Sequence, residues 1–165
     1  MKTYVDLKFA DGEYRCALPI LQIEEVQTAC GGSGIGEIYA RVLQGRMASD
    51  TTVAHPGFAA YRLSDLVETI RHGLIGGNLC IVAGVEKPVG PLRANQLVDR
   101  YIGEPGKPLL LPLKDLWDMA AAILFATIEG YAPDGDVVDE EADDDKKKAP
   151  DGGGSTTQEP LPTAP

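Results

Sequence analysis

The fold is decided by the stretch PLKDLWDMAAAILFATI, residues 112–128. Pro112 suits the first turn of a helix, and apolar residues then recur every three or four positions round much of the helical circumference. They are Leu113, Leu116, Trp117, Ala120, Ile123, Leu124 and Ile128. A helix that is apolar over most of its surface must be covered by the rest of the chain. We therefore expect residues 112–128 to form the centre of the core.

Four more segments have helical periodicity, and each is bounded by proline, glycine or a capping residue. The expected helices cover residues 19–30, 35–43, 63–75 and 91–102. Pro19 and Pro91 are suited to open two of them, Ser64 is expected to cap the third, and glycines follow all four. Residues 46–60 interrupt the pattern and are expected to form a surface loop or insertion. The helices should pack as a small orthogonal cluster.

The first 18 residues predict a β-hairpin instead. Between Tyr4 and Phe9, polar and apolar residues alternate, which is the period of a half-buried strand. Asp11-Gly12 follows, and this pair favours a tight hairpin turn. The expected class is therefore mainly α with an N-terminal β-hairpin (α+β) and about five helices. Residues 78–90 stay open, because Leu79–Val82 could form a short strand or an apolar loop packed on the core.

The end of the chain differs in composition from the rest. Residues 134–165 contain ten Asp or Glu and three Lys, a charge of −7, which leaves −3 of the formal −10 for residues 1–133. Gly and Pro recur there and large aliphatic residues are few, so too little apolar surface is available to offset the entropy of ordering. We expect one domain over residues 1–132 and a disordered acidic tail over 133–165. Neither part has a surface suited to neutralising phosphates, so nucleic acid is not an expected partner.

No motif predicts catalysis or a bound metal. His55 and His72 are the only histidines, and neither has a Cys or carboxylate at metal-ligand spacing. The three cysteines have no CxxC spacing and are expected to be free, buried or half-buried thiols. The glycine-rich residues 31–36 follow a helix rather than a strand, so we expect a linker and not a phosphate-binding loop. The prediction is a protein that is not an enzyme and has no cofactor or metal.

The sequence also predicts a protein that stays in the compartment where it is made. The N-terminus has no apolar run after Lys2, and no window approaches the roughly 18 apolar residues of a membrane span. We therefore expect a cytoplasmic protein without a membrane partner. The sequence does not indicate its oligomeric state.

Several pieces of sequence, taken in order, resemble a known family. They are Asp11-Gly12-Glu13-Tyr14-Arg15 with Leu18-Pro19, Gly36-Glu37-Ile38-Tyr39-Ala40-Arg41-Val42-Leu43 with Gly45, Ile70-Arg71-His72-Gly73-Leu74-Ile75-Gly76-Gly77, and Ala94 with Leu97-Val98-Asp99-Arg100-Tyr101-Ile102. With the apolar last helix they cover most of residues 3–130. The chain thus resembles the small tail assembly proteins of phage-like gene transfer agents and siphophages, known as tail assembly chaperones or tail tube proteins. It departs from that pattern after Gly45, at residues 78–90 and in the acidic tail.

The resemblance implies a chaperone that attends the tape-measure protein and the tail-tube protein during tail morphogenesis, in the cytoplasm of a bacterial host. A tape-measure protein exposes apolar helical stripes before the tube closes, and a groove on a small helical domain could cover them. We predict that this groove lies between the expected helices at 63–75 and 91–102. Its expected protein-binding residues are Leu66, Ile70, Leu74, Leu97, Tyr101 and Ile102.

Three alternatives remain open. The first is a structural subunit retained in the finished tail, although a tube subunit normally needs a substantial β-sheet and only one hairpin is evident. The second is a DNA-binding regulator with a helix-turn-helix, which suits the helical content but not the charge. The third is a small enzyme or small-ligand module, which would need converging polar groups that the sequence does not indicate.

Overall fold

The computed structural model describes residues 1–50 and 61–130, which all belong to one compact unit, Met1–Gly135. Residues 51–60 of the expected loop at 46–60, and the whole expected tail at 133–165, lie outside the described residues. The loop prediction is wrong for residues 46–50, which are helical. For the other residues, and for the domain boundary at 132, the predictions stay predictions.

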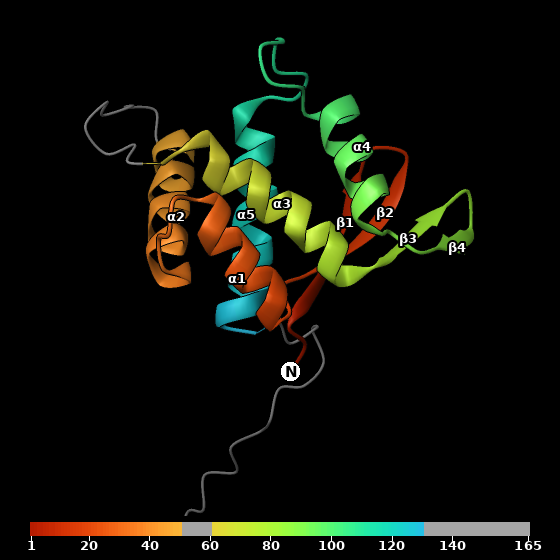
Figure 1. Ribbon diagram of the computed structural model, residues 1–165, viewed down its shortest axis with the longest axis horizontal. Coiled ribbons are helices and arrows are strands. Elements are labelled where there is room, and N and C mark those ends of the chain that lie inside the picture. Colours follow the sequence, from red (N-terminus) through yellow and green to blue (C-terminus); the bar gives the residue numbers. More distant parts are fainter. Residues whose placement is uncertain (51–60, 131–165) are drawn as a thin grey trace, which may run out of the picture. The chain divides into compact units, whose positions relative to one another are not determined.

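The N-terminal hairpin is confirmed, and it forms half of a four-stranded antiparallel sheet (Figure 1). The strands are β1 (Tyr4–Phe9), β2 (Gly12–Ala17), β3 (Leu79–Val82) and β4 (Val85–Lys87), in the spatial order β1-β2-β3-β4. Strand β2 pairs with β1 from Tyr4↔Ala17 to Phe9↔Gly12, and with β3 through Tyr14↔Cys80. The two hairpins, far apart in the sequence, therefore share one sheet.

The second hairpin answers the question left open at residues 78–90. Asn78 ends the preceding helix in the left-handed conformation, and the turn at Ala83 and Gly84 also has positive φ, 51° and 77°. The side-chain oxygen of Asn78, just before β3, accepts the N–H of Val89, just after β4, at 3.1 Å. This hydrogen bond closes the open end of the hairpin, opposite its turn. Ala83 stands where a tight hairpin turn usually has Asn or Asp before Gly, and alanine rarely adopts positive φ. The sequence therefore has no residue pair here that would predict a hairpin turn.

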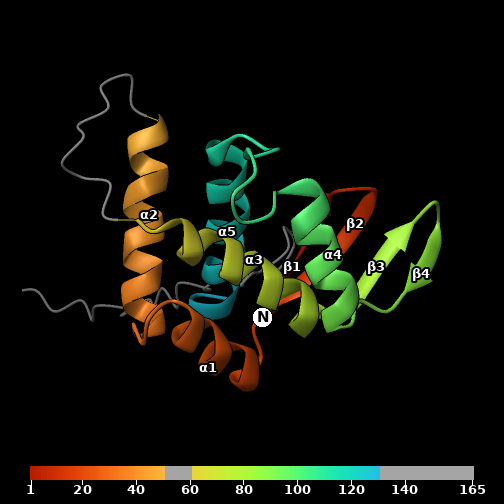
Figure 2. The same ribbon diagram turned by 45° about the horizontal axis from the view of Figure 1, so that its top comes forward.

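The described part of the chain contains five helices, which confirms the expected class (Figures 1 and 2). They are α1 (Ile20–Ala29), α2 (Ile35–Asp50), α3 (Leu63–Gly77), α4 (Pro91–Tyr101) and α5 (Leu113–Ile128). The expected end of α2 at Gly45 is wrong, because the helix continues to Asp50. A single glycine costs an exposed helix only about 1 kcal/mol, and the residues that follow it are compatible with a helix.

The beginning of α3 also differs from the expectation. Ser64 was expected to cap the helix, but it lies inside the first turn, and the N-cap residue is Arg62. The carboxylate of Asp65 accepts the backbone N–H of Arg62 at 3.2 Å and so closes the reciprocal half of a capping box. The side chain that helps to cap the helix is therefore the carboxylate of Asp65, which takes the N–H of Arg62, and not the hydroxyl of Ser64.

Helix α3 shares the centre of the core with α5. It packs against β2, α5, α1 and α4, while α5 packs mainly against α2 and α3. At its C-terminal end α3 comes so close to β2 that a Cβ at Gly76 or Gly77 would overlap the strand backbone. These two glycines do more than end a helix, because no larger residue would allow this approach.

Among the described residues, helices cover one face of the sheet and leave the other exposed. Phe9, Tyr14, Cys16 and Cys80 are buried on that face. Asp6, Lys8, Glu13 and Ile81, on the opposite face, are exposed. In Figures 1 and 2 the β3–β4 hairpin extends away from the helices. Antiparallel sheets with one solvated face show this alternation of apolar and polar residues.

Candidate functional site

The structure brings the predicted binding residues together, but it does so inside the core. Helices α3 and α4 pack against each other. Five of the six side chains are buried: Leu66, Ile70, Leu74, Leu97 and Ile102. The sixth, Tyr101, is half-buried and meets the ring of Phe9 edge to face at 6.0 Å. The expected groove is therefore filled by the protein's own side chains, because the apolar stripes of these helices cover one another. That these residues bind a partner stays a prediction.

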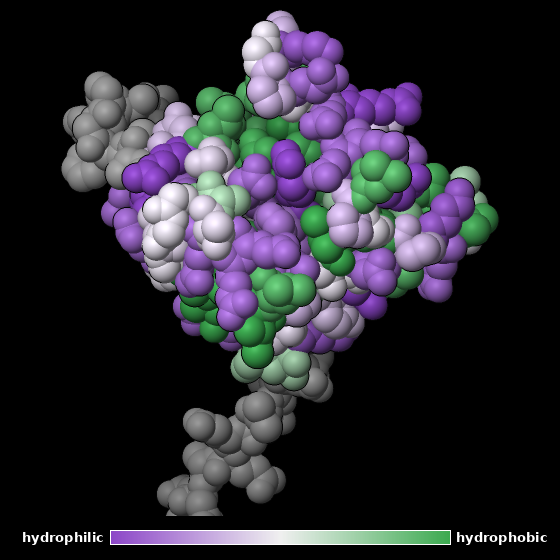
Figure 3. All heavy atoms as spheres, viewed as in Figure 1, coloured by the Kyte–Doolittle hydropathy of each residue, from purple (hydrophilic) through white to green (hydrophobic). Residues whose placement is uncertain are grey.

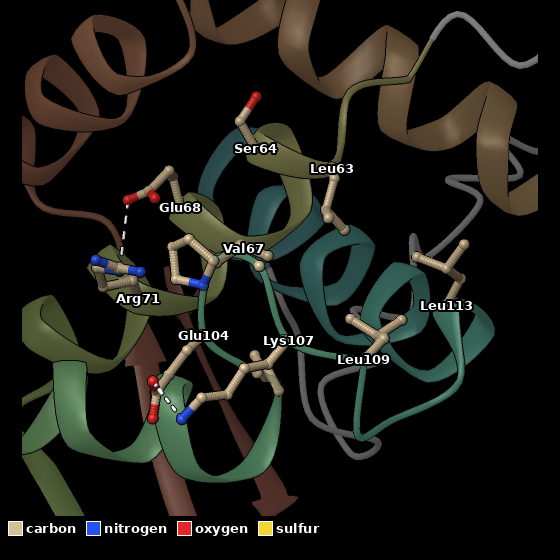
Figure 4. Close-up of a pocket in the computed structure, with 13 residues that line it drawn as sticks. Leu63, Ser64, Val67, Glu68, Arg71, Glu104, Lys107, Leu109 and Leu113 are labelled. Carbon is tan, nitrogen blue, oxygen red and sulfur yellow. Dashed lines mark ion pairs between the residues drawn. The ribbon is translucent and has the colours of Figure 1, made fainter.

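A pocket of about 490 Å³ opens next to these residues (Figure 4). It lies between α3, the connection from α4 to α5, and the first residue of α5. Its lining residues are Leu63, Ser64, Val67, Glu68 and Arg71 of α3, Ile102, Gly103, Glu104, Pro105, Gly106, Lys107 and Leu109 of the connection, and Leu113 of α5. Of the predicted binding residues, Ile102 is the one that contributes to it. The volume falls in the range of natural ligand pockets.

Exposed leucines give the pocket its character. In Figure 4, Leu63, Leu109 and Leu113 point toward one another on one side of the pocket. Leu63 is 48% exposed, Leu109 is 40% exposed, and the neighbouring Leu110 is 60% exposed. In Figure 3 a hydrophobic area lies below the 103–112 connection, which is at the top of the view. Grouped apolar side chains of this kind on a surface mark a binding site more often than scattered ones do.

Two ion pairs occupy the other side of the pocket. Arg71 Nε lies 3.5 Å from Glu68 Oε2, and Lys107 Nζ lies 2.7 Å from Glu104 Oε2. Both pairs are short-range in sequence, and their charges cancel. The pocket therefore has an apolar side and a polar, electrically neutral rim, which suits the two faces of an amphipathic segment.

The connection that forms one wall is shaped by glycine and proline. Gly103 and Gly106 have φ of 137° and 82°, and the N–H of Leu110 donates to the carbonyl of Ile102 at 2.9 Å. Pro108 and Pro112 bracket the run Leu109-Leu110-Leu111. This run is the signal that sequence reasoning missed: three leucines between two prolines cannot continue a helix, and an apolar run in a loop needs a surface to cover it.

The wall contributed by α3 is tied down by a buried ion pair. Asp65 is fully buried, and its two carboxylate oxygens accept Arg41 Nε at 2.8 Å and Arg41 Nη2 at 2.9 Å. The Nη1 group of Arg41 donates to Ser33 Oγ at 3.1 Å and to Glu37 Oε1 at 2.7 Å. Burial by itself raises the pKa of Asp65, but the hydrogen bonds from Arg41 and the N–H of Arg62 outweigh it, so the pKa lies below its ordinary value. The carboxylate is therefore held in its charged form.

This network also gives the glycine-rich segment its role. Gly31 and Gly32 both have positive φ, and their N–H groups donate to the carbonyls of Thr28 and Gln27 at the end of α1. Ser33 then turns its hydroxyl to Arg41. The segment is thus a connection from α1 to α2, as expected, and its polar side chain is used inside the molecule.

Other reactive groups in the described part of the chain are shielded or paired. Cys16, Cys30 and Cys80 are free and buried, as expected, and burial raises the pKa of Cys16 and of Cys30 to about 12. His72 Nδ1 lies 3.0 Å from Glu25 Oε2, which links α1 to α3. Within residues 1–50 and 61–130, no three His, Cys, Asp or Glu side chains gather as a metal would require. That the protein is not an enzyme and has no cofactor stays a prediction.

Among the helices that the structure describes, none has the length and apolar character needed to cross a membrane.

Comparison with known proteins points to phage tails. No curated protein and no solved structure matches the chain. One protein family does, described as phage tail tube protein, GTA-gp10, and the match extends over residues 2–130. It includes both hairpins, all five helices and every residue of the pocket. The family suggested by the sequence motifs is thereby confirmed: the chain belongs to the phage tail tube protein, GTA-gp10, family.

Proposed function

We propose that this tail protein is an assembly chaperone, and that its pocket binds an apolar helical segment of the tape-measure protein during tail morphogenesis. Membership of a phage tail family supports the setting. The observation that carries the proposal is the pair of exposed leucines, Leu63 and Leu109, that line a pocket with a neutral polar rim.

The chemistry of the pocket fits a transient partner. A helix that lays its apolar face into the pocket would remove these leucines from water, and each square ångström of apolar surface so buried contributes about 25 cal/mol. The pairs Glu68–Arg71 and Glu104–Lys107 would meet the polar face of such a helix. Rim charges of this kind add little affinity by themselves. We therefore expect a complex that is held together mainly by apolar contacts and that dissociates when the partner polymerises.

Capture of the tape-measure protein tests the proposal. The two proteins of the same tail are co-expressed, and the chaperone candidate is pulled down as wild type and as Leu63→Asp or Leu109→Asp. Both variants place a charge in the pocket and are expected to lose capture. Leu92→Asp is the matched control, because Leu92 is 74% exposed on α4 and does not line the pocket. Equal capture by all four chains contradicts the proposal.

A structural subunit of the finished tail is the second candidate, and the sheet favours it. The argument against a tube subunit is that the sequence indicates a single hairpin, whereas four strands pair in the structure, and the described residues leave one face of their sheet exposed. An uncovered face could pack against a neighbouring subunit. Mass spectrometry of purified particles distinguishes the candidates, since a chaperone is expected to be absent and a tube subunit abundant.

A further inference from the structure

We infer that Arg41 and Asp65 are positioning residues for the pocket: their buried ion pair sets where the first turn of α3 lies, and that turn supplies one wall. This inference rests on the proposed function only in treating the pocket as the binding site. Neither residue lines the pocket, so any effect they have on a partner must pass through α3.

The first step is that several contacts converge on one turn of helix. Asp65 is the third residue of α3, and it accepts hydrogen bonds from Arg41 and from the backbone of Arg62. The guanidinium of Arg62 donates through Nη1 to the carbonyl of Cys30 at 3.2 Å. The start of α3 is therefore fastened to α2 by one arginine and to the end of α1 by another.

The second step is that the pocket begins within two residues of this carboxylate. Leu63, Ser64 and Val67 all line the pocket, and all three are at least partly exposed. Apolar burial thus fixes these pocket residues only in part. Helix α2, which carries Arg41, packs mainly against α5. The ion pair therefore supplies a direct connection between α2 and the pocket wall.

The third step is that bidentate geometry fixes orientation as well as distance. Arg41 uses Nε and Nη2 on the two oxygens of Asp65 and uses Nη1 on Ser33 and Glu37. A planar guanidinium held at three sides leaves the carboxylate little freedom to rotate. Lysine at position 41 would keep the charge but lose this fork, so it separates orientation from charge.

The chain contains a reporter for this turn. Trp117 is the only tryptophan, and its ring meets Tyr61 edge to face, with centroids 4.6 Å apart. Tyr61 immediately precedes Arg62. A displacement of the first turn of α3 would change the surroundings of Trp117, and the fluorescence emission of the full chain would record it without any partner present.

The experiment compares four variants of the full chain. Asp65→Asn and Arg41→Lys disturb the buried pair. Asp6→Asn makes the same chemical change in the exposed pair between Asp6 and Arg15. Val89→Ala removes buried apolar volume away from the pocket and serves as a generally destabilised control. Thermal melting gives the melting temperature of each variant. Far-UV circular dichroism, Trp117 emission and capture of the tape-measure protein are then measured well below that temperature.

We expect Asp65→Asn to keep the helical spectrum, shift Trp117 emission to longer wavelength and weaken capture by about tenfold. Arg41→Lys should do the same to a smaller extent. Val89→Ala should lower the melting temperature with emission and capture unchanged, and Asp6→Asn should change neither of these two readouts. If Asp65→Asn fails to fold, Arg41→Lys decides the result.

Unchanged emission and unchanged capture in a folded Asp65→Asn or Arg41→Lys chain would overturn the inference, and so would equal changes in Val89→Ala. Failure of the proposed function has a different signature. If the proposed function is wrong, the wild-type chain itself does not capture the tape-measure protein. Trp117 emission still shows in that case whether the ion pair positions the first turn of α3.

Discussion

Two arginine–aspartate pairs with the same chemistry lie in different parts of this molecule. Arg41 and Asp65 join α2 to α3, and Arg15 and Asp6 face each other across β2 and β1. In each pair Nε and Nη2 of the arginine donate to the two carboxylate oxygens, at 2.8 and 2.9 Å in the first and at 2.9 and 3.3 Å in the second. The two pairs differ in their exposure to solvent.

The side chains of Arg41 and Asp65 are 10% and 0% exposed, whereas those of Arg15 and Asp6 are 35% and 38% exposed. Water can replace either member of the exposed pair, and Arg15 keeps a second contact through its guanidinium, which lies 4.2 Å from the centre of the Tyr4 ring. No solvent reaches Asp65 to take over from Arg41. The comparison teaches that burial, more than bond geometry, determines what the loss of a partner costs.

The largest expected effect comes from removing one carboxylate of each pair. Asp65→Ala leaves the mostly buried Arg41 with only the exposed Glu37 as an anionic partner, and it should lower the free energy of unfolding by about 3 kcal/mol. Asp6→Ala should lower it by less than about 1 kcal/mol. Urea denaturation followed by Trp117 fluorescence and circular dichroism measures both. Similar losses for the two variants would break the comparison.

Replacing the arginine of each pair by lysine tests the comparison between the buried and the exposed pair in a second way. Lysine keeps the charge but forms no fork, so Arg41→Lys gives up hydrogen bonds to a buried carboxylate and should cost about 2 kcal/mol. Arg15→Lys should cost less than about 0.5 kcal/mol, because water completes the hydrogen bonding of Asp6. The same denaturation curves provide the values. A larger loss for Arg15→Lys than for Arg41→Lys is the contrary result.

Low pH should remove the stabilisation that the Arg41–Asp65 pair contributes to the folded state. The pKa of Asp65 lies below its ordinary value of 3.8, so the folded state binds the carboxylate proton less readily than the unfolded state. The pair's contribution is therefore complete above the ordinary value and is lost as pH falls through the lowered one. The difference in unfolding free energy between wild type and Asp65→Ala should be constant near neutral pH and should shrink below about pH 4. A difference that grows in acid would show that the sign is wrong.

Salt gives the smallest effect and acts on the other pair. At about 1 M salt the screening length falls to about 3 Å, so the cost of Asp6→Ala should decrease by a few tenths of a kcal/mol. The cost of Asp65→Ala should stay the same within error, since ions do not enter the space between its partners. Denaturation at low and high sodium chloride, with the two variants side by side, provides the measurement.

Predictions from the sequence succeeded where a feature depends on the local pattern of residues, and failed where it depends on burial by distant parts of the chain. The hairpin at Tyr4–Ala17 and the periodicity of α3, α4 and α5 are local features, and each was recognised from spacing alone. The second hairpin was left open because its turn uses Ala83 at positive φ, a conformation that only a surrounding structure imposes. The cap of α3 was assigned to Ser64, whereas the N-cap residue is Arg62 and Asp65 completes the capping box. Asp65 is held in that place by Arg41, which is 24 residues away in the sequence.

The predicted groove shows most clearly what sequence periodicity cannot determine. The residues expected to form a groove have the strongest apolar periodicity, and for that very reason the core uses them: Leu66, Ile70 and Leu74 are buried. The pocket is instead lined by leucines that break the helical pattern or stand at its start, such as Leu63 and Leu109. Periodicity identifies a surface that must be covered, but not whether the chain itself or a partner covers it.

By itself the sequence determined the helices, the first hairpin and the family, because these depend on the spacing of residues along the chain. Only the tertiary structure decided that β3 and β4 complete a sheet, that Arg41 meets Asp65, and that the exposed leucines gather at one pocket. The physical reason is that water is excluded by residues distant in sequence. Whether a leucine is available to a partner, or a carboxylate depends on its arginine, is fixed when the whole chain packs.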